Sequence, residues 1–305
     1  MTTQTVSLGY IGLGNMGGPM ATRLSKAGFR VSVYGRNKAR LKPALDAGAI
    51  ERATAKEVAE HSDIVFLCLT DTDAVEQVVF GNAGISNGAR RGSTLIDHST
   101  ISPKATIAMA SRLAEMTGVS WIDAPVSGGT IGASSGTLSI FAGGKQETFD
   151  AVLPILKHVG RNITLMGGVG AGQNTKLVNQ IILSCSVVVL AEACAFAERT
   201  GLDVSALPKA LAGGRADSTS LQHYWPRLAE RDFTPYSTVT SILKDLQIIL
   251  ETGQPLGALF PVSATVNECY KVLANGGYAS EDLTALMRVL AAPASGRAQV
   301  PSPLA

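Results

Sequence analysis

The sequence predicts an α/β domain with a doubly wound, mostly parallel sheet, followed by an all-α domain that a long helix joins to it. Short apolar segments rich in β-branched residues alternate with helix-length amphipathic segments up to about Gly167, which is typical of βαβ units. A glycine-rich loop directly follows the first apolar segment. After Gly172 the strand-like segments stop, and the remaining chain has helical periodicity.

The expected elements follow from these patterns in chain order. Ser102 and Pro103 mark one helix start clearly, because serine is a good N-cap and proline suits the first helical position. In the first half we expect strands at residues 6–11, 30–34, 64–69, 94–97, 120–123, 137–141 and 162–165, and helices that include 17–27, 74–80 and 103–116. In the second half we expect a long helix that ends near Thr200, and helices near residues 204–211, 241–252, 262–274 and 281–290.

Composition and charge exclude several classes of function. The chain of 305 residues is 46% hydrophobic and 16% charged, which is typical of a globular protein. A net charge of +2 provides no strong field for nucleic acid or an anionic membrane. The four cysteines lie apart in apolar stretches, which favours buried thiols in a reducing compartment over disulfides or metal ligands. The longest apolar stretch, residues 181–191, is too short to cross a bilayer.

These observations set the expected location and the domain limits. We expect a soluble, cytoplasmic protein with no bound metal, no nucleic-acid partner and no membrane-spanning segment. The strand pattern places the α/β domain at residues 1–167 and the all-α domain at residues 168–291. Residues 292–305 are rich in proline, alanine and serine, and we expect them to be a disordered tail.

The stretch GYIGLGNMGG places Gly12, Gly14 and Gly17 in the GxGxxG spacing between a strand and a helix. Gly12 permits a tight turn, Gly14 lets the backbone approach a pyrophosphate, and Gly17 lets the helix pack closely on the sheet. The helix N-terminus then faces the phosphates. A glycine-rich turn that binds no nucleotide is the alternative, but the position between strand and helix favours a dinucleotide-binding Rossmann domain.

The end of the second strand indicates which dinucleotide binds. An NAD-binding domain usually has an acidic residue there, about 20 residues past the glycine loop. This chain has Gly35, Arg36 and Asn37 at that position, with Lys38 and Arg40 close behind. Because a guanidinium can bind a 2′-phosphate, the sequence favours NADP. NAD stays open as the alternative, since the same cations would suit a solvated loop.

A second glycine-containing turn follows the strand at residues 120–123. Ser127, Gly128 and Gly129 offer backbone N–H groups that can converge on an anion such as a substrate carboxylate. A purely structural turn explains these glycines at least as well. The chain contains neither the Ser/His/Asp order of a hydrolase nor a metal-ligand spacing that would indicate another chemistry.

A lysine in the first turns of the long apolar helix raises the question of its role. Lys176 could extend its ammonium to water along its methylene stem, or it could face a cleft. Asn179 and Gln180 lie on the same helix face, because residues at i, i+3 and i+4 are neighbours. Three polar groups on one patch favour a cleft. There the lysine could donate a proton to a substrate oxygen as hydride arrives, with the amides orienting the substrate.

Four stretches of the chain resemble the β-hydroxyacid dehydrogenase family in order and spacing. They are GYIGLGNMGGPMA, DAPVSGGTIGASSGTLSIFAGG, GAGQNTKLVNQ and KDL, and they span nearly the whole chain. The resemblance implies a Rossmann domain joined by a long helix to an all-α domain that dimerises. It also implies NADP or NAD as cofactor, a small carboxylate substrate, and a homodimer or homotetramer.

The resemblance implies roles for individual residues. Lys176 resembles the family's catalytic acid/base, and Asn179 resembles an amide that orients the substrate. The residues expected to bind the substrate are Ser127, Gly128, Gly129, Asn179 and Gln180. The residues expected to bind the cofactor are Gly12, Leu13, Gly14, Asn15, Met16, Gly17, Gly35, Arg36, Asn37, Leu69, Thr100 and Lys244.

One position separates branches of the family. Many relatives have a second asparagine where this chain has Gln180, and Gln180 with residues 213–221 resembles the branch of tartronate semialdehyde reductases. We therefore expect an oxidoreductase that interconverts a small 3-hydroxy acid and its semialdehyde, with the longer amide of Gln180 reaching a substrate hydroxyl. Dehydrogenases of 3-hydroxyisobutyrate or 4-hydroxybutyrate are the alternative. An imine reductase and a non-catalytic nucleotide-binding protein are further alternatives, and Lys176 argues against both.

Overall fold

The computed structural model describes residues 6–291, and these form two compact units. The first unit comprises the chain up to Gln180 together with Lys244–Leu259. The second comprises Ile181–Leu243 and the segment from Phe260 onward. Two helices, α8 (Ala171–Arg199) and α11 (Val239–Gly253), each contribute residues to both units.

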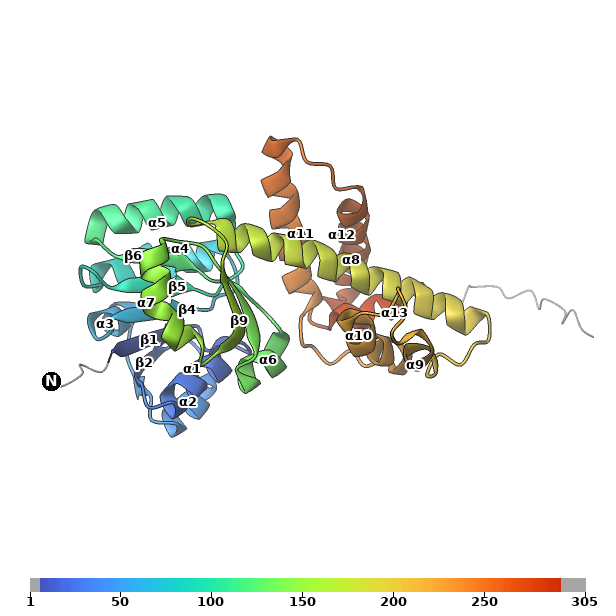
Figure 1. Cartoon of the computed structure of the whole chain (residues 1–305), viewed down its shortest axis with the longest axis horizontal. Coiled ribbons are helices and arrows are strands. Elements are labelled where there is room, and N and C mark those ends of the chain that lie inside the picture. Colours follow the sequence, from blue (N-terminus) through green and yellow to red (C-terminus); the bar gives the residue numbers. More distant parts are fainter. Residues whose placement is uncertain (1–5, 292–305) are drawn as a thin grey trace, which may run out of the picture. The chain divides into compact units, whose positions relative to one another are not determined.

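The first unit contains a parallel six-stranded sheet within the described residues (Figure 1). Its strand order is β3-β2-β1-β4-β5-β6, and every neighbouring pair is parallel. The chain order reverses between β1 and β4, so the predicted doubly wound sheet is confirmed. The strands are β1 (Ser7–Ile11), β2 (Arg30–Tyr34), β3 (Ile50–Glu51), β4 (Ile64–Leu67), β5 (Thr94–Asp97) and β6 (Ser120–Asp123).

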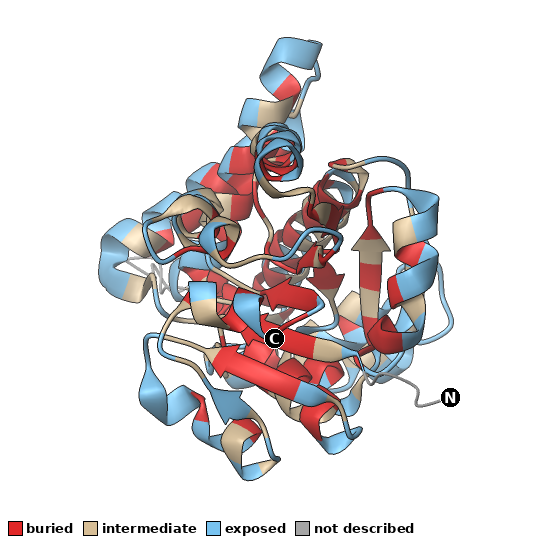
Figure 2. Ribbon diagram, turned by 90° about the vertical axis from the view of Figure 1, so that its left-hand side faces the viewer, coloured by how far each residue is buried: buried red, intermediate tan, exposed pale blue. Residues whose placement is uncertain are grey.

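Helices cover both faces of this sheet, and its central strands are mostly buried (Figure 2). In β4, Phe66 faces one hydrophobic core while Val65 and Leu67 face the other, as the alternation of side chains along a strand requires. The first core is packed by α1 (Gly17–Lys26), α2 (Lys42–Asp46) and α7 (Gln146–Leu156). The second is packed by α3 (Ala55–Glu60), α4 (Thr72–Phe80) and α5 (Pro103–Thr117).

A separate small sheet follows the large one in the same unit. It has the order β7-β8-β9, with β7 antiparallel to β8 and β8 parallel to β9. The sequence predicted the last two of these strands but not β7, because a two-residue strand carries no periodicity. The elements are β7 (Val126–Ser127), α6 (Gly129–Ser135), β8 (Leu138–Ala142) and β9 (Gly160–Leu165).

After β9 the described chain contains no further strand, so the predicted all-α character of this half is confirmed. The sequence did not predict α10 (Thr219–Glu230), whose aromatic and charged residues and internal Pro226 obscure the helical pattern. The remaining helices are α9 (Leu207–Leu211), α12 (Pro261–Leu273) and α13 (Met287–Leu290). Short non-α turns are η1 (Lys38–Arg40), η2 (Ile85–Asn87), η3 (Gln254–Leu256), η4 (Ala274–Tyr278) and η5 (Leu283–Leu286).

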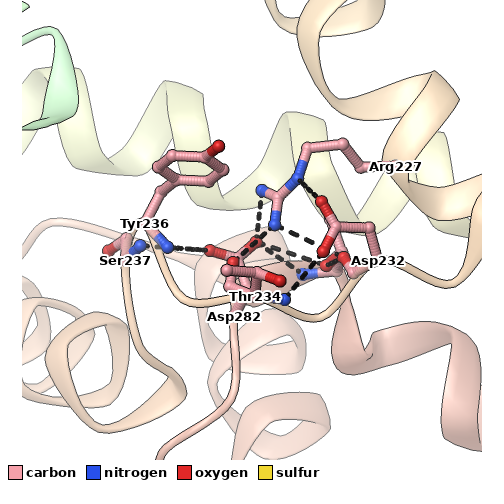
Figure 3. A network of polar contacts seen from close by, with 7 residues as sticks. Arg227, Asp232, Thr234, Tyr236, Ser237 and Asp282 are labelled. Carbon is pink, nitrogen blue, oxygen red and sulfur yellow. Dashed lines mark hydrogen bonds and ion pairs between the residues drawn. The ribbon is translucent and has the colours of Figure 1, made fainter. Parts of the chain in front are cut away.

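A buried arginine organises the loop before α11 in the second unit (Figure 3). Arg227 donates Nε to Oδ2 of Asp232 at 3.0 Å and Nη1 to Oδ1 of Asp282 at 2.9 Å. The other carboxylate oxygen of Asp282 accepts the N–H groups of Tyr236 at 2.8 Å and Ser237 at 3.1 Å. Asp282 is fully buried, so loss of Arg227 would leave an uncompensated charge inside the unit.

The helix α8 is long and apolar enough to span a membrane by length and composition alone. Within the structure, 44% of its most apolar part is buried. Core helices of soluble proteins meet the same criterion, so this helix is weak evidence for a membrane. The expectation of a protein without a membrane-spanning segment stays a prediction.

Candidate active site

A cleft of about 470 Å³ opens where β1, β2 and β4 end. This is the point at which the strand order reverses, and open parallel sheets bind their ligands at such points. The cleft is also lined by residues of α4 and of the segment after it. The predicted cofactor residues that line the cleft are Gly12, Leu13, Gly14, Gly35, Arg36, Asn37 and Leu69.

The glycine loop has the backbone shape that a pyrophosphate site requires. Gly12 has a φ of +91°, and a side chain there would overlap the carbonyl oxygen of Cys68. A Cβ atom at Gly17 would overlap the carbonyl oxygen of Gly12, so only glycine lets α1 begin this close to the loop. At Gly14 a Cβ atom would meet only Nη1 of Arg40, at 3.6 Å. The loop therefore has room for a dinucleotide beside the start of α1.

The segment after β2 presents positive charge to the cleft. Arg36 and Arg40 both line it, and no Asp or Glu is among its lining residues within the described chain. Lys38 points its charge elsewhere, because it forms an ion pair with Glu51. The side chain of Asn37 accepts the N–H of Ala39 at 3.1 Å and caps η1. The segment after β2 therefore presents two guanidinium groups to the cleft.

The first turns of α8 are held against the ends of β5 and β6. Asp123, the last residue of β6, accepts the backbone N–H groups of Gly170 at 2.8 Å and Gln173 at 2.9 Å, and thereby caps the helix. The side-chain amide of Gln173 donates to the carbonyl of Ser99 at 2.8 Å and accepts the N–H of Ile101 at 3.2 Å. Residues one turn further along α8 are therefore fixed relative to the carboxyl edge of the sheet.

Lys176 occupies that next turn, and its side chain is buried with 8% exposure. This burial argues against the alternative in which the ammonium extends to water. Burial lowers the pKa of Lys176 to about 8, while Asp245 on α11 raises it and Lys244 lowers it. Nζ of Lys244 lies 3.0 Å from Oδ1 of Asp245 and also donates to the carbonyl of Thr100. Lys244 thus pairs with Asp245, and the charges of Asp245 and Lys244 act on the pKa of Lys176 in opposite directions.

A chain of side-chain hydrogen bonds connects the two amides of α8 to α11. Nε2 of Gln180 donates to Oδ2 of Asp245 at 2.5 Å, and Nδ2 of Asn179 donates to Oε1 of Gln180 at 2.9 Å. Gln180 and Asp245 are buried, whereas Asn179 is partly exposed. Protein groups therefore bind both ends of the Gln180 amide, and Asn179 is the more accessible of the two.

Two buried carboxyl groups lie at the ends of the neighbouring strands. Burial raises the pKa of Asp97, the last residue of β5, to about 7, and it raises the pKa of Asp123 to about 6. In both groups, hydrogen bonds from backbone N–H groups lower the pKa and partly offset the effect of burial. In residues 6–291 no three His, Cys, Asp or Glu side chains converge as a metal site would require.

The turn after β6 has the conformation expected of its glycines. Gly128 has a φ of +127° and Gly129 a φ of +61°, and side chains disfavour both conformations. A Cβ atom at Gly128 would also lie 3.2 Å from Cδ2 of Leu138. The turn is held by α6, where Gly132 donates its N–H to the carbonyl of Gly128 at 3.0 Å. A role for Ser127, Gly128 and Gly129 in anion binding stays a prediction.

The structure therefore sorts the predicted site residues into groups. One group lines the cleft, a second surrounds Asp245, and the third is the turn after β6. Asn15 and Met16 lie between the loop and α1, where Met16 is the N-cap without a side-chain bond. The group around Asp245 comprises Lys176, Asn179, Gln180, Lys244 and Thr100.

Sequence reasoning missed three polar residues that build this region. Asp123 and Gln173 fix the start of α8, and Asp245 connects both lysines with the amides. A signal was available for each. Asp123 ends a buried strand, Gln173 lies one turn before Lys176, and Asp245 interrupts the apolar stretch SILKDLQIIL.

Comparison with known proteins covers nearly the whole chain. Residues 7–168 match the NAD binding domain of 6-phosphogluconate dehydrogenase. Residues 170–290 match the family described as NAD-binding of NADP-dependent 3-hydroxyisobutyrate dehydrogenase.

Individual proteins show the same similarity. The 2-hydroxy-3-oxopropionate reductase of Escherichia coli (strain K12) is 39% identical over 289 residues, which is 93% of this chain and 97% of that protein. The 2-(hydroxymethyl)glutarate dehydrogenase of Eubacterium barkeri is 32% identical over 94% of this chain and 95% of its own length. The crystal structure of 3-hydroxyisobutyrate dehydrogenase from Salmonella typhimurium superimposes with a TM-score of 0.85 at 27% identity, covering 93% of this chain and 99% of that one.

Proposed function

Because this chain belongs to the NAD(P)-dependent β-hydroxyacid dehydrogenases, we propose that it reduces tartronate semialdehyde, also called 2-hydroxy-3-oxopropionate, with NADPH as the preferred cofactor. The observation that carries the proposal is the buried Lys176 with its lowered pKa, fixed by α8 at the carboxyl edge of the sheet. A lysine in this setting can exchange a proton near neutral pH.

The cleft at the glycine loop would hold the cofactor. Gly12 and Gly14 leave room for the pyrophosphate, and Arg36 would bind the 2′-phosphate. When bound, the reduced nicotinamide supplies the hydride that reduces the substrate. The two arginines of the cleft and its lack of a lining carboxylate in the described chain support NADPH over NADH.

Lys176 would provide the proton in the direction of reduction. Its ammonium donates to the substrate oxygen as negative charge develops there, and its neutral amine accepts the proton back in the reverse direction. A pKa of about 8 places both forms within reach of neutral pH. Burial of the side chain strengthens its interaction with a developing oxyanion, because little water competes with it.

Several features support a small, anionic and hydroxylated substrate. The ammonium groups of Lys176 and Lys244 lie near each other and favour an anion, and we assign the turn at residues 127–129 to the substrate carboxylate. Asn179 offers a partly exposed amide for a hydroxyl. The similarity to 2-hydroxy-3-oxopropionate reductase supports tartronate semialdehyde. The similarity to 3-hydroxyisobutyrate dehydrogenase makes methylmalonate semialdehyde the second candidate.

A spectrophotometric screen tests the proposal. The loss of reduced-nicotinamide absorbance is followed with tartronate, methylmalonate and succinate semialdehydes and with a cyclic imine, each with NADPH and with NADH. We expect the highest kcat/KM for tartronate semialdehyde with NADPH. Turnover of the imine alone, or a higher kcat/KM for a semialdehyde without a hydroxyl, would contradict the substrate assignment.

A further inference from the structure

We propose that Asp245 is a positioning residue that sets the direction of both amides on α8, so that Asn179 presents its carbonyl oxygen to the substrate. This inference rests on the proposed function for the identity of the substrate. The hydrogen-bond chain from Asp245 through Gln180 to Asn179 carries it, with distances of 2.5 Å and 2.9 Å.

The direction of this chain of hydrogen bonds follows from the chemistry of Asp245, where it begins. An ionised carboxylate only accepts hydrogen bonds, so Gln180 must turn its NH₂ group toward Asp245. Its carbonyl oxygen then points to Asn179, which must donate its own NH₂ group. The Asn179 carbonyl oxygen is the end of that amide not committed to Gln180. An amide pair by itself could reverse as a unit, and the carboxylate removes this freedom.

Burial makes this direction costly to reverse. Gln180 and Asp245 are each 5% exposed, and hydrogen bonds to ionised groups are stronger than those between neutral groups. If Gln180 turned over, its carbonyl oxygen would face the Asp245 carboxylate, and two buried acceptors would lie against each other without a proton. The native direction is therefore enforced from α11 rather than by the substrate.

The consequence concerns which substrates the site selects. An amide oxygen accepts hydrogen bonds, so its partner on the substrate is a hydroxyl rather than a carboxylate oxygen. A site built to bind a hydroxyl discriminates strongly against analogues that lack it. In this account Gln180 acts through Asn179, in place of the direct contact with substrate that its length suggested.

Asp245 also acts on the charge of Lys176. Asp245 and Lys244 from α11 act on Lys176, and Asp97 of β5 and Asp123 of β6 end the two strands against which the first turns of α8 are held. Of these, Asp245 is the carboxylate that counteracts the burial of the Lys176 ammonium. Loss of the Asp245 charge should therefore lower the pKa of Lys176, and this effect can be measured separately from a change in the direction of the amides.

The first experiment measures that charge without requiring turnover. Lys176 is titrated by NMR in enzyme with ¹³C-labelled lysine, its signal being assigned by loss in Lys176→Arg. Asp245→Asn should lower its pKa by about 1 unit, because an opposite charge has been removed. Asp245→Glu should restore most of it, and Gln180→Met, which retains the carboxylate, should leave it unchanged. An equal pKa in the wild type and Asp245→Asn overturns this part of the inference.

The second experiment measures substrate selection. The ratio of kcat/KM for tartronate over methylmalonate semialdehyde should fall about tenfold in Gln180→Met and in Asp245→Asn, since each frees Asn179 to turn. The double variant should fall little further, because both changes act on one chain of bonds. Equal loss for both substrates would show a merely structural role. Wild-type enzyme that reduces neither compound would contradict the proposed function, while the titration would still test Asp245.

Discussion

Lys176 shows at the residue scale how burial brings the pKa of an ordinary side chain closer to neutral pH. Its spacing with Asn179 and Gln180 is visible in the sequence, because residues three and four apart share a helix face. Asp245, the carboxylate that raises the pKa of Lys176, was not predicted. It lies 65 positions after Gln180, to which it is hydrogen-bonded, and only the tertiary fold brings the two residues together. Charge pairs between distant elements leave no periodic signal.

The pH dependence of the two reaction directions follows from the Lys176 pKa of about 8. Reduction requires the ammonium, so its kcat/KM should be constant below this value and fall as pH rises through it. Oxidation requires the neutral amine, so its kcat/KM should rise through the same range. Steady-state rates in both directions across pH measure this. A change in kcat/KM near the ordinary lysine pKa of 10.5 would contradict the assignment, and so would a change in the same sense for both reaction directions.

Arg36 offers a residue-scale test of cofactor preference with a control beside it. Arg36→Gln should reduce the kcat/KM ratio of NADPH over NADH by about 10- to 100-fold, because a hydrogen bond to a charged group contributes roughly 1.5–3 kcal/mol. Lys38→Gln removes the same charge two positions away, but Lys38 pairs with Glu51 and does not line the cleft. It should leave the ratio unchanged. Equal effects of the two variants would mean that cofactor preference depends only on the overall positive charge of this segment.

At the scale of elements, the sequence predicted what periodicity and caps can encode. Five strands of the large sheet, the loop-to-helix junction at Gly17 and the start of α5 at Pro103 were all predicted. The short strands β3 and β7 were not, because two residues of extended chain have no pattern. The anchoring of α8 was also missed, since it depends on a capping carboxylate, Asp123, that arrives from another element.

That anchoring gives a prediction about glycine at the start of α8. A Cβ atom at Gly172 would overlap the carbonyl oxygen of Phe141 and lie 2.6 Å from that of Asp123. Gly172→Ala should therefore lower the free energy of unfolding by about 1–3 kcal/mol, as overpacking does, and lower kcat by displacing Lys176. At Gly168 a Cβ atom would meet nothing within 4 Å, so Gly168→Ala is the matched control and should be nearly neutral. Urea unfolding and kinetics of both variants decide whether the close approach matters.

At the scale of the whole molecule, two features were predictable from the sequence for different reasons. The doubly wound sheet follows from repeated βαβ patterning, and the change to helices follows from the end of that patterning near Gly172. The predicted tail at 292–305 lies outside the described residues. We retain a cytoplasmic homodimer or homotetramer as a proposal, and light scattering of the purified protein measures its assembly.

The most direct test of the account is a single-turnover measurement on Lys176→Ala. Enzyme in excess over NADPH is mixed with tartronate semialdehyde, and the loss of reduced-nicotinamide absorbance is followed alongside the NADPH dissociation constant. We expect the chemical step to be slowed by about 10²- to 10⁴-fold, as for loss of a general acid. The NADPH affinity should be unchanged, because Lys176 does not line the cofactor cleft. A chemical step as fast as that of the wild type, with only the semialdehyde bound more weakly, would contradict this expectation.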